Sequence, residues 1–215
     1  MNDIKIRLAG IQDLDRLTEL HCASFKPEDH VPVMLGKRYV MATYKWLVTS
    51  PDAYSLVAEI DETLVGLIAV CDKPFTKPMF MACLGEFLLS ILNKPALLFQ
   101  KNLWNRLFRH SDSSVNGEII ANHPKMAQMT IGAVDSGYRG VAIFPALVEA
   151  TKSFSKARGS RGIRAGVYKT NEPCRRVFVK GGWIETKELE TPETVFYVAY
   201  LDPTFPKELG IILPS

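Results

Sequence analysis

Residues 171–183 read NEPCRRVFVKGGW and predict a helix that ends at a pair of glycines. Upstream of this stretch, residues 163–168 form a β-rich run that predicts a strand. Downstream, residues 183–186 predict another strand. The stretch therefore predicts a strand, a helix and a strand in succession.

The rest of the chain continues this alternation in both directions. Residues 61–63 form a short polar turn between two β-rich runs, which is typical of a hairpin. The order of elements is β, α, α, β, β, an insertion, β, α, β, α, β, β. It predicts an α/β (α+β) fold with a mixed, mostly antiparallel sheet of six to seven strands flanked by helices. The further strands are expected at 4–9, 54–60, 64–70, 125–134 and 194–201, and the further helices at 13–25, 33–48 and 141–158.

Length and composition are those of an ordinary globular protein. The 215 residues are 47% hydrophobic and 23% charged, which is too apolar for disorder. We expect one domain, 1–215, with an insertion at 73–115. The four cysteines are widely separated without a CxxC pair, so we expect neither a metal site nor a disulfide framework. The start, MNDIKIRLAG, lacks a long apolar run, which argues against a signal peptide and favours a cytoplasmic location.

The insertion is unusual in charge and in hydrophobicity. Residues 73–115 carry a charge of +4, although the whole chain carries only +3, and such a local excess indicates a local anionic partner or a solvated helical face. The total is too small to indicate nucleic acid. Residues 79–92 are almost wholly apolar with Glu86 as the one charge, and they are too short to span a bilayer. This segment is a buried helix, an interface or a re-entrant contact.

The residues after Pro95 predict an amphipathic helix with a basic face. An aromatic helix of this kind is suited to a membrane surface, and the alternatives are a cover for the sheet or a homodimer contact. The predicted apolar stripe consists of Leu98, Phe99, Leu103, Leu107 and Phe108, and the basic side chains beside it are Lys101, Arg106 and Arg109.

Residues 129–183 resemble the GCN5-related N-acetyltransferase (GNAT) superfamily. In that family a strand ends in a valine, and a turn of pattern Gln/Arg-x-x-Gly-x-Gly/Ala leads into a helix; here RGVAIF occupies residues 139–144. Backbone N–H groups at a helix N-terminus can cradle a pyrophosphate, and the resemblance implies acetyl-CoA or coenzyme A there. The implied cofactor-binding residues of this part are Ala133, Val134, Arg139, Gly140, Val141, Ala142, Ile143 and Phe144.

Two residues of this turn depart from the family pattern. Ala142 stands where the family prefers glycine, and its backbone N–H is kept. Phe144 stands where the family prefers glycine or alanine, and it brings a large ring near the phosphate path unless the ring turns into the core. Pro145 is tolerated in a first helical turn.

Residues 171–183 match a second family pattern, Asn-x-x-Ala-x-x-x-Tyr-x-x-x-Gly-Phe. In the family this helix splays from the preceding strand and coenzyme A enters the gap, which places Asn171, Cys174, Arg175 and Phe178 at the cofactor. The tyrosine with which many members protonate the departing thiolate corresponds to Phe178, which has no proton to give. The alternatives are that Tyr168 is the proton donor, that water delivers the proton, or that the protein is not a catalyst.

The resemblance implies an acyl-CoA-dependent N-acetyltransferase in which a small amine attacks the thioester directly, with an amino sugar favoured as the acceptor. A base near the carbonyl is then expected. The predicted catalytic residues are Glu118, His30 and Tyr168, and Glu28 and His123 are further candidate bases. The competing interpretation is an inactive acyl-CoA-binding protein, or a protein that docks on a membrane or a partner through residues 73–115.

Overall fold

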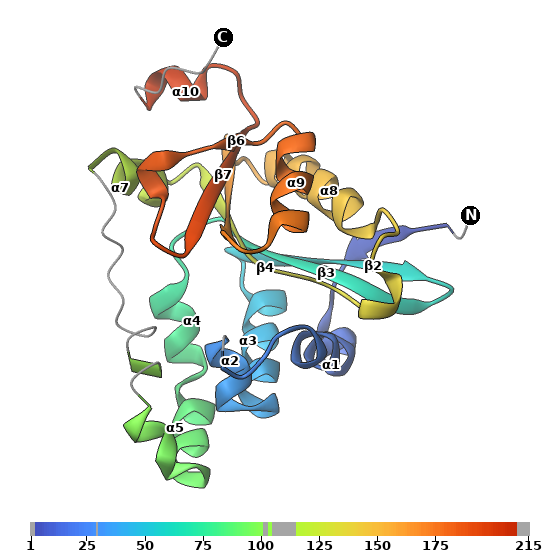
Figure 1. The fold of residues 1–215 in the computed structure, drawn as a ribbon, viewed down its shortest axis with the longest axis vertical. Coiled ribbons are helices and arrows are strands. Elements are labelled where there is room, and N and C mark those ends of the chain that lie inside the picture. The colour runs from blue at the N-terminus through green and yellow to red at the C-terminus, as the bar shows by residue number, and fades with distance from the viewer. Residues whose placement is uncertain (1–2, 29, 101–102, 105–114, 210–215) are drawn as a thin grey trace.

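The computed structural model describes residues 3–28, 30–100, 103–104 and 115–209. Its central sheet has seven strands within these residues, in the order β1-β2-β3-β4-β5-β7-β6 (Figure 1). Neighbouring strands are antiparallel except β4 and β5, which are parallel. The prediction of a mixed, mostly antiparallel sheet is therefore confirmed. The strands are β1 (Lys5–Leu8), β2 (Ala53–Ile60), β3 (Thr63–Cys71), β4 (Met126–Val134), β5 (Gly162–Tyr168), β6 (Ile184–Glu185) and β7 (Thr194–Tyr200).

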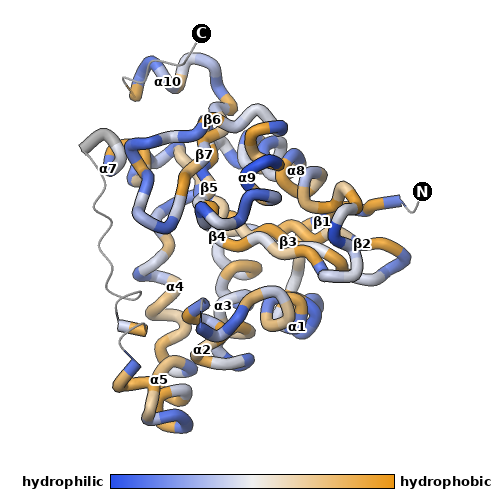
Figure 2. Tube along the Cα trace, in the orientation of Figure 1, coloured by the Kyte–Doolittle hydropathy of each residue, from blue (hydrophilic) through white to orange (hydrophobic). Residues whose placement is uncertain are grey.

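Helices cover both faces of this sheet. On one face lie α1 (Leu14–Ser24) and α3 (Lys37–Thr49), and on the other lie α8 (Ile143–Ala157) and α9 (Glu172–Lys180). Strands β2 and β3 are buried almost throughout, because successive side chains point alternately into the two apolar layers. The hydropathy trace in Figure 2 shows both strands as largely apolar.

The structure corrects several predicted boundaries. The helix predicted at 33–48 is two helices, α2 (Val31–Leu35) and α3, because Gly36 between them has a φ of 109°. The turn between β2 and β3 has two residues, Asp61 and Glu62, both with positive φ. Two helices were not predicted: α7 (Val115–Asn122), which precedes β4, and α10 (Phe205–Glu208).

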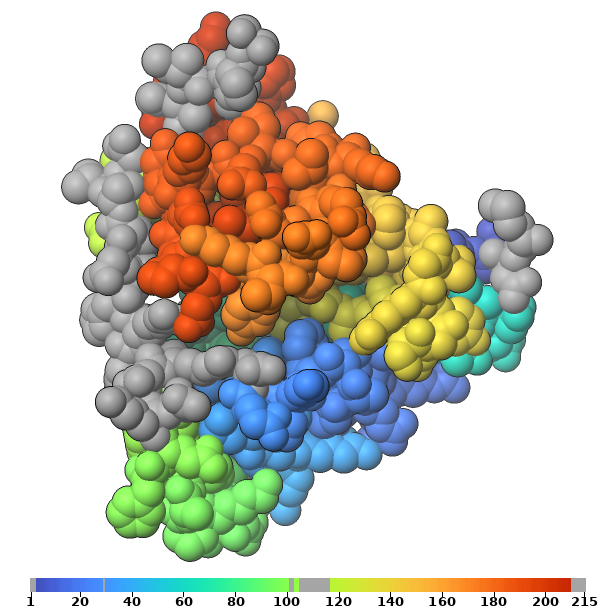
Figure 3. Space-filling view, in the orientation of Figure 1, coloured from blue at the N-terminus to red at the C-terminus, as the bar shows by residue number. Residues whose placement is uncertain are grey.

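The described part of the insertion consists of α4 (Thr76–Ala82), α5 (Leu84–Asn93) and the 3-10 turn η2 (Pro95–Phe99). It packs on α2 and α3, and Figure 3 shows its helices in green next to the blue N-terminal helices. The buried contact joins Cys83, Phe87, Leu97 and Leu103 of the insertion with Met34, Leu35 and Tyr39.

One detail of the insertion differs from the sequence prediction, and a second adds to it. Leu98 and Phe99 are 46% and 87% exposed while Leu103 is buried, so these members of the predicted stripe do not share one environment. Glu86, the one charge of residues 79–92, accepts two hydrogen bonds from Arg38 on α3. The basic residues Lys101, Arg106 and Arg109, with Leu107 and Phe108, lie outside the described residues. Among the described helices, none is long and apolar enough to cross a bilayer.

Candidate active site

Strands β4 and β5 run together for only part of their length. Their parallel pairing begins with Met126 opposite Gly162 and ends with Met129 opposite Ala165. Beyond that point β4 is paired with β3 and β5 with β7, but the two strands are no longer paired with each other. The sheet therefore opens between two strands that begin side by side.

A β-bulge lies at the point where the two strands part. Ala69 of β3 faces Ile131 of β4, whereas the next residue, Val70, faces Met129, so Thr130 is an extra residue in β4. The Thr130 hydroxyl donates a hydrogen bond to the Ala69 carbonyl at 3.2 Å, which fixes the bulge to β3. Because a bulge bends its strand and increases the local twist, it turns the end of β4 away from β5.

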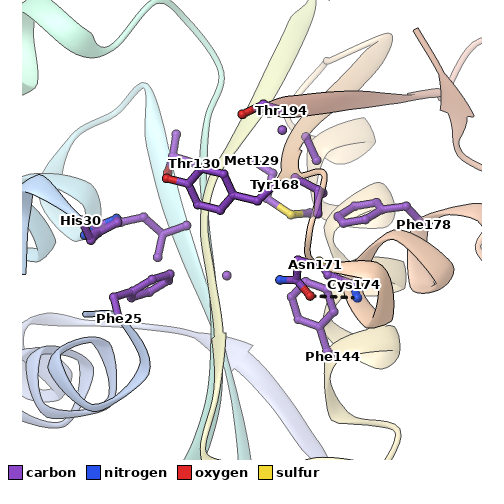
Figure 4. Close-up of a pocket in the computed structure, with 15 residues that line it drawn as sticks. Phe25, His30, Met129, Thr130, Phe144, Tyr168, Asn171, Cys174, Phe178 and Thr194 are labelled. Atoms are coloured by element: carbon purple, nitrogen blue, oxygen red, sulfur yellow. Dashed lines mark hydrogen bonds between the residues drawn. The ribbon is translucent and has the colours of Figure 1, made fainter. Parts of the chain in front are cut away.

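A pocket of about 270 Å³ occupies the opening between β4 and β5. Figure 4 shows Phe25 and His30 on one side of β4, and Phe144, Cys174 and Phe178 on the other. The pocket is thus lined from both faces of the sheet.

The loop between β4 and α8 brings the N-terminus of α8 to the pocket side of the sheet. Gly140 has a φ of 89°, a conformation that favours glycine. The helix begins at Ile143, and Ala142 before it provides no side-chain cap, so the positive end of the helix is left for an external anion. The Ile143 N–H is bonded to the Val141 carbonyl, so it is not one of the donors. Arg139 is exposed, and its side chain has no hydrogen-bond or ion-pair partner among the described residues.

The Phe144 ring turns towards the sheet and away from this loop. A Cβ atom on Gly132 of β4 would lie 2.9 Å from the ring, which shows how closely the ring approaches the strand. The ring also meets Phe178 edge to face, with 6.1 Å between their centroids. Phe144 therefore forms part of the pocket wall, and the helix N-terminus stays open despite the large side chain.

Helix α9 forms the part of the pocket wall next to Phe144. Asn171 caps the helix, because its Oδ1 accepts a hydrogen bond from the Cys174 N–H at 3.3 Å, and both residues line the pocket. Phe178 is 1% exposed and stacks on Tyr197, with 5.5 Å between their centroids. Burial raises the pKa of the Cys174 thiol to about 12, so Cys174 is not a nucleophile at neutral pH.

Arg175 does not point into the pocket. Its guanidinium donates to the Tyr197 hydroxyl at 3.2 Å and to the Lys169 carbonyl at 3.4 Å, and Glu185 lies beyond at 3.7 Å. The sequence pattern predicted Arg175 at the cofactor, but these contacts direct its side chain to the far side of α9. Ala133 and Ile143 are buried in the core and are not part of the pocket lining.

Several solved structures with a similar arrangement of strands and helices are N-acetyltransferases. The PaiA N-acetyltransferase from Thermoplasma acidophilum in complex with coenzyme A is 14% identical, with a TM-score of 0.59 over 92% of this chain and 99% of that one. Arabidopsis thaliana NAA60 in complex with acetyl-CoA is 16% identical, with a TM-score of 0.57 over 92% and 98%. The chain has the GNAT fold. At the level of sequence, no family model and no curated protein match.

Within the GNAT fold, two of the three predicted catalytic residues line the pocket. His30 enters from the loop between α1 and α2, and Tyr168 from the end of β5, where it is 43% exposed. Figure 4 shows the Tyr168 ring directed across β4, to the side where His30 lies. Glu118 is exposed on α7 and does not line the pocket. The further candidates, Glu28 and His123, are not part of the lining either, and His123 packs on Phe205.

A chain of three side chains that the sequence analysis missed ends at His30. The Tyr44 hydroxyl lies 2.9 Å from His21 Nδ1, and His21 Nε2 lies 3.2 Å from His30 Nδ1. His21 is fully buried. Its pKa is lowered to about 3, mainly by burial and to a smaller extent by the charge of the nearby His30. The ring of Phe25 stacks on His30, with 4.5 Å between centroids. The one signal in the sequence was a histidine on the apolar face of the predicted helix 13–25.

The direction of the hydrogen bonds in this chain follows from Tyr44. Among the described residues His21 is the one hydrogen-bond partner of Tyr44, so the buried hydroxyl donates its proton to His21 Nδ1. Neutral His21 then carries its proton on Nε2 and donates it to His30 Nδ1. Neutral His30 therefore carries its own proton on Nε2.

Proposed function

We propose that the protein is an acetyl-CoA-dependent N-acetyltransferase that transfers the acetyl group to a small amine by direct attack of the amine on the thioester. The observation that carries this proposal is the parting of β4 and β5 at the Thr130 bulge, beside the uncapped N-terminus of α8. The likeness to the solved N-acetyltransferases supports the same function. Amino sugars are the first class of acceptor to screen.

The cofactor belongs on the α8 and α9 side of the sheet. Arg139 and the N-terminus of α8 would hold the pyrophosphate, since both present positive charge to the solvent. The arm that carries the acetyl group would lie in the opening between the strands, where Asn171 and Phe178 form the wall. The backbone N–H groups of β4 beyond Met129 have no partner strand on the β5 side and would polarise the thioester carbonyl.

The acceptor amine belongs on the opposite side, where His30 and Tyr168 lie. We assign the role of general base to His30, which takes a proton from the amine on its Nε2. For this the chain of hydrogen bonds reverses, so that His30 Nδ1–H donates to His21 Nε2. This reversal leaves the Tyr44 hydroxyl without an acceptor, at a cost of about 1–3 kcal/mol. We assign delivery of a proton to the departing thiolate to Tyr168, because Phe178 has none to give.

Calorimetric titration with acetyl-CoA, followed by free coenzyme A, tests the proposed function. We expect micromolar binding of both and, once the cofactor is bound, turnover with at least one amine in a screen. Absence of binding to either would overturn the proposal. The exposed apolar side chains of the insertion, which include Leu92 and Phe99, would then favour a docking protein.

Arg139→Ala is expected to weaken coenzyme A binding by about 1.5–3 kcal/mol, because a charged hydrogen bond to phosphate is lost. The control is Arg16→Ala on α1, which removes an exposed arginine whose one hydrogen bond within the described part of the chain goes to the Glu62 carbonyl. The affinities for coenzyme A and for pantetheine, which lacks the pyrophosphate, are compared by calorimetry. Equal affinity of the Arg139 variant and the wild type for coenzyme A would contradict the assignment of this loop.

A further inference from the structure

Arg164 on β5 is a half-buried cation with a fully buried guanidinium Nε, and it has no anionic partner among the described residues. Its Nη2 donates to Gln128 Oε1 at 2.5 Å, and its buried Nε has no partner. A guanidinium has five N–H donors and no acceptor, so one hydrogen bond leaves most of its capacity unused. Burial lowers the pKa of Arg164 to about 10, and no carboxylate of the described residues pairs with it. An unpaired buried charge is unfavourable, which indicates a missing partner.

The guanidinium faces a cavity of about 110 Å³ between β4, β5, the end of α7 and the first residues of the insertion. This volume is several times the roughly 15 Å³ that one water molecule needs. Among the described residues the lining contains no acidic side chain, and it includes the cation Lys73, the hydroxyl of Thr76 and the Gln128 amide. Because Gln128 Oε1 already accepts from Arg164, the donor end of its amide is left for another group. The cavity thus combines two positive charges, one of which, Lys73, also pairs with Asp52 at 2.7 Å.

The cavity lies on the same face of the sheet as the acceptor side of the pocket. Alternate residues of a strand share a face, so Arg164, Gly166 and Tyr168 point the same way, and Tyr168 and Gly166 line the pocket. On β4, Gln128 precedes the Thr130 bulge by two residues. Two residues of a strand span about 7 Å, so the cavity at Gln128 and the pocket at Thr130 are neighbours on this face of the sheet.

We propose that the Arg164 cavity binds an oxyanion, a carboxylate or a phosphate, that belongs to the acceptor amine. The acceptor is then a bifunctional molecule, with its amine at His30 and its anionic group between Arg164, Gln128 and Lys73. This statement of the substrate class rests on the proposed function. The anion site at Arg164 does not rest on the proposed function, because it is inferred from the unpartnered guanidinium and the cavity alone.

Inorganic phosphate is the probe for the anion site itself. We expect phosphate to raise the melting temperature of the wild type above its value in chloride of equal ionic strength, and Arg164→Gln to lose most of this shift. The control Arg16→Gln keeps the shift. Phosphate bound at the N-terminus of α8 raises the melting temperature of all three proteins equally. The difference between the shifts of the wild type and of Arg164→Gln therefore measures phosphate bound at Arg164. Without phosphate, Arg164→Gln is expected to melt at the wild-type temperature or above it, because it no longer buries a lone charge. An unchanged phosphate shift in Arg164→Gln would overturn the site.

Matched pairs of amines test whether the anion is part of the acceptor. Phosphoethanolamine is compared with ethanolamine, and β-alanine with propylamine, so that the two pairs distinguish a phosphate from a carboxylate. We expect the wild type to prefer one anionic member at least tenfold in kcat/KM, and Arg164→Gln to lose this preference while the KM for acetyl-CoA is unchanged. Equal rates within both pairs would overturn the substrate class. Absence of acetyl-CoA binding would instead overturn the proposed function, and the phosphate experiment would still decide on Arg164.

Discussion

His30→Gln is expected to lower kcat for acetyl transfer by about 10²–10⁴-fold, because a positioned base contributes this factor and glutamine cannot take a proton. The substitution keeps a hydrogen-bond acceptor for His21 Nε2, so the chain of buried side chains is disturbed little. Binding of acetyl-CoA is expected to be unchanged, since His30 lies on the other side of β4 from the cofactor side. The measurement is steady-state kinetics with the best amine, together with calorimetry for acetyl-CoA.

His123→Gln is the matched control for this substitution. It removes a histidine that packs on Phe205 and accepts a hydrogen bond from the Lys125 N–H, outside the pocket. Its kcat is expected to stay within about twofold of the wild type. If His30→Gln retained wild-type kcat across the pH range, the assignment of the base to His30 would be wrong.

Tyr44→Phe separates the two directions in which the hydrogen-bond chain can run. In the wild type, protonation of His30 on Nε2 reverses the chain and leaves the Tyr44 hydroxyl without an acceptor. In the variant, His21 Nδ1 has no partner in either direction of the chain, so the penalty for the reversal is smaller. We expect the acidic limb of the pH–rate profile to move up by about one pH unit, since one unit corresponds to about 1.4 kcal/mol. If His30 acts only as a hydrogen-bond donor, the limb stays in place and the rate falls across the whole profile.

The order of strands and helices could be predicted because each element has a clear period and clear ends. The run NEPCRRVFVKGGW shows both the cap of α9 and its glycine end, and the structure places Asn171 as that cap. The split between α2 and α3 was missed because Gly36 lies within a run that is otherwise helical in pattern. A lone glycine in such a run lowers helix stability by only about 1 kcal/mol, so the sequence alone does not reveal a break.

The candidate site was predicted most fully where its residues lie in one continuous motif. Phe178 and Asn171 belong to such a motif and line the pocket. The bulge at Thr130 depends on the register between β3 and β4, which no local pattern encodes. The contact of His21 with His30 and Tyr44 joins α1, the following loop and α3, and Arg164 meets Gln128 across two strands. Such contacts follow from tertiary structure, and the sequence shows them only as single polar residues in apolar surroundings.

His21 is expected to make the protein unstable in mild acid. Its pKa in the folded protein is about 3, and the ordinary value is 6.5. Between these values the unfolded chain binds a proton that the folded protein does not, so the free energy of unfolding falls as the pH falls through this window. The slope approaches 1.4 kcal/mol per pH unit, so we expect a loss of about 2 kcal/mol between pH 6.5 and pH 4.5. Urea denaturation at half-unit pH intervals measures it.

His21→Gln isolates this effect, because glutamine offers Tyr44 an acceptor and His30 a donor but does not titrate. We expect its free energy of unfolding to be nearly flat from pH 6.5 to pH 4.5, whereas His123→Gln keeps the wild-type slope. Carboxylates such as Asp13, whose pKa is lowered by the hydrogen bond from Arg7, lose their stabilising charge only below this window. An equal slope in His21→Gln and the wild type would mean that His21 takes up its proton in the folded protein. The direction of the hydrogen-bond chain, and the resting tautomer assigned to His30, would then have to be abandoned together.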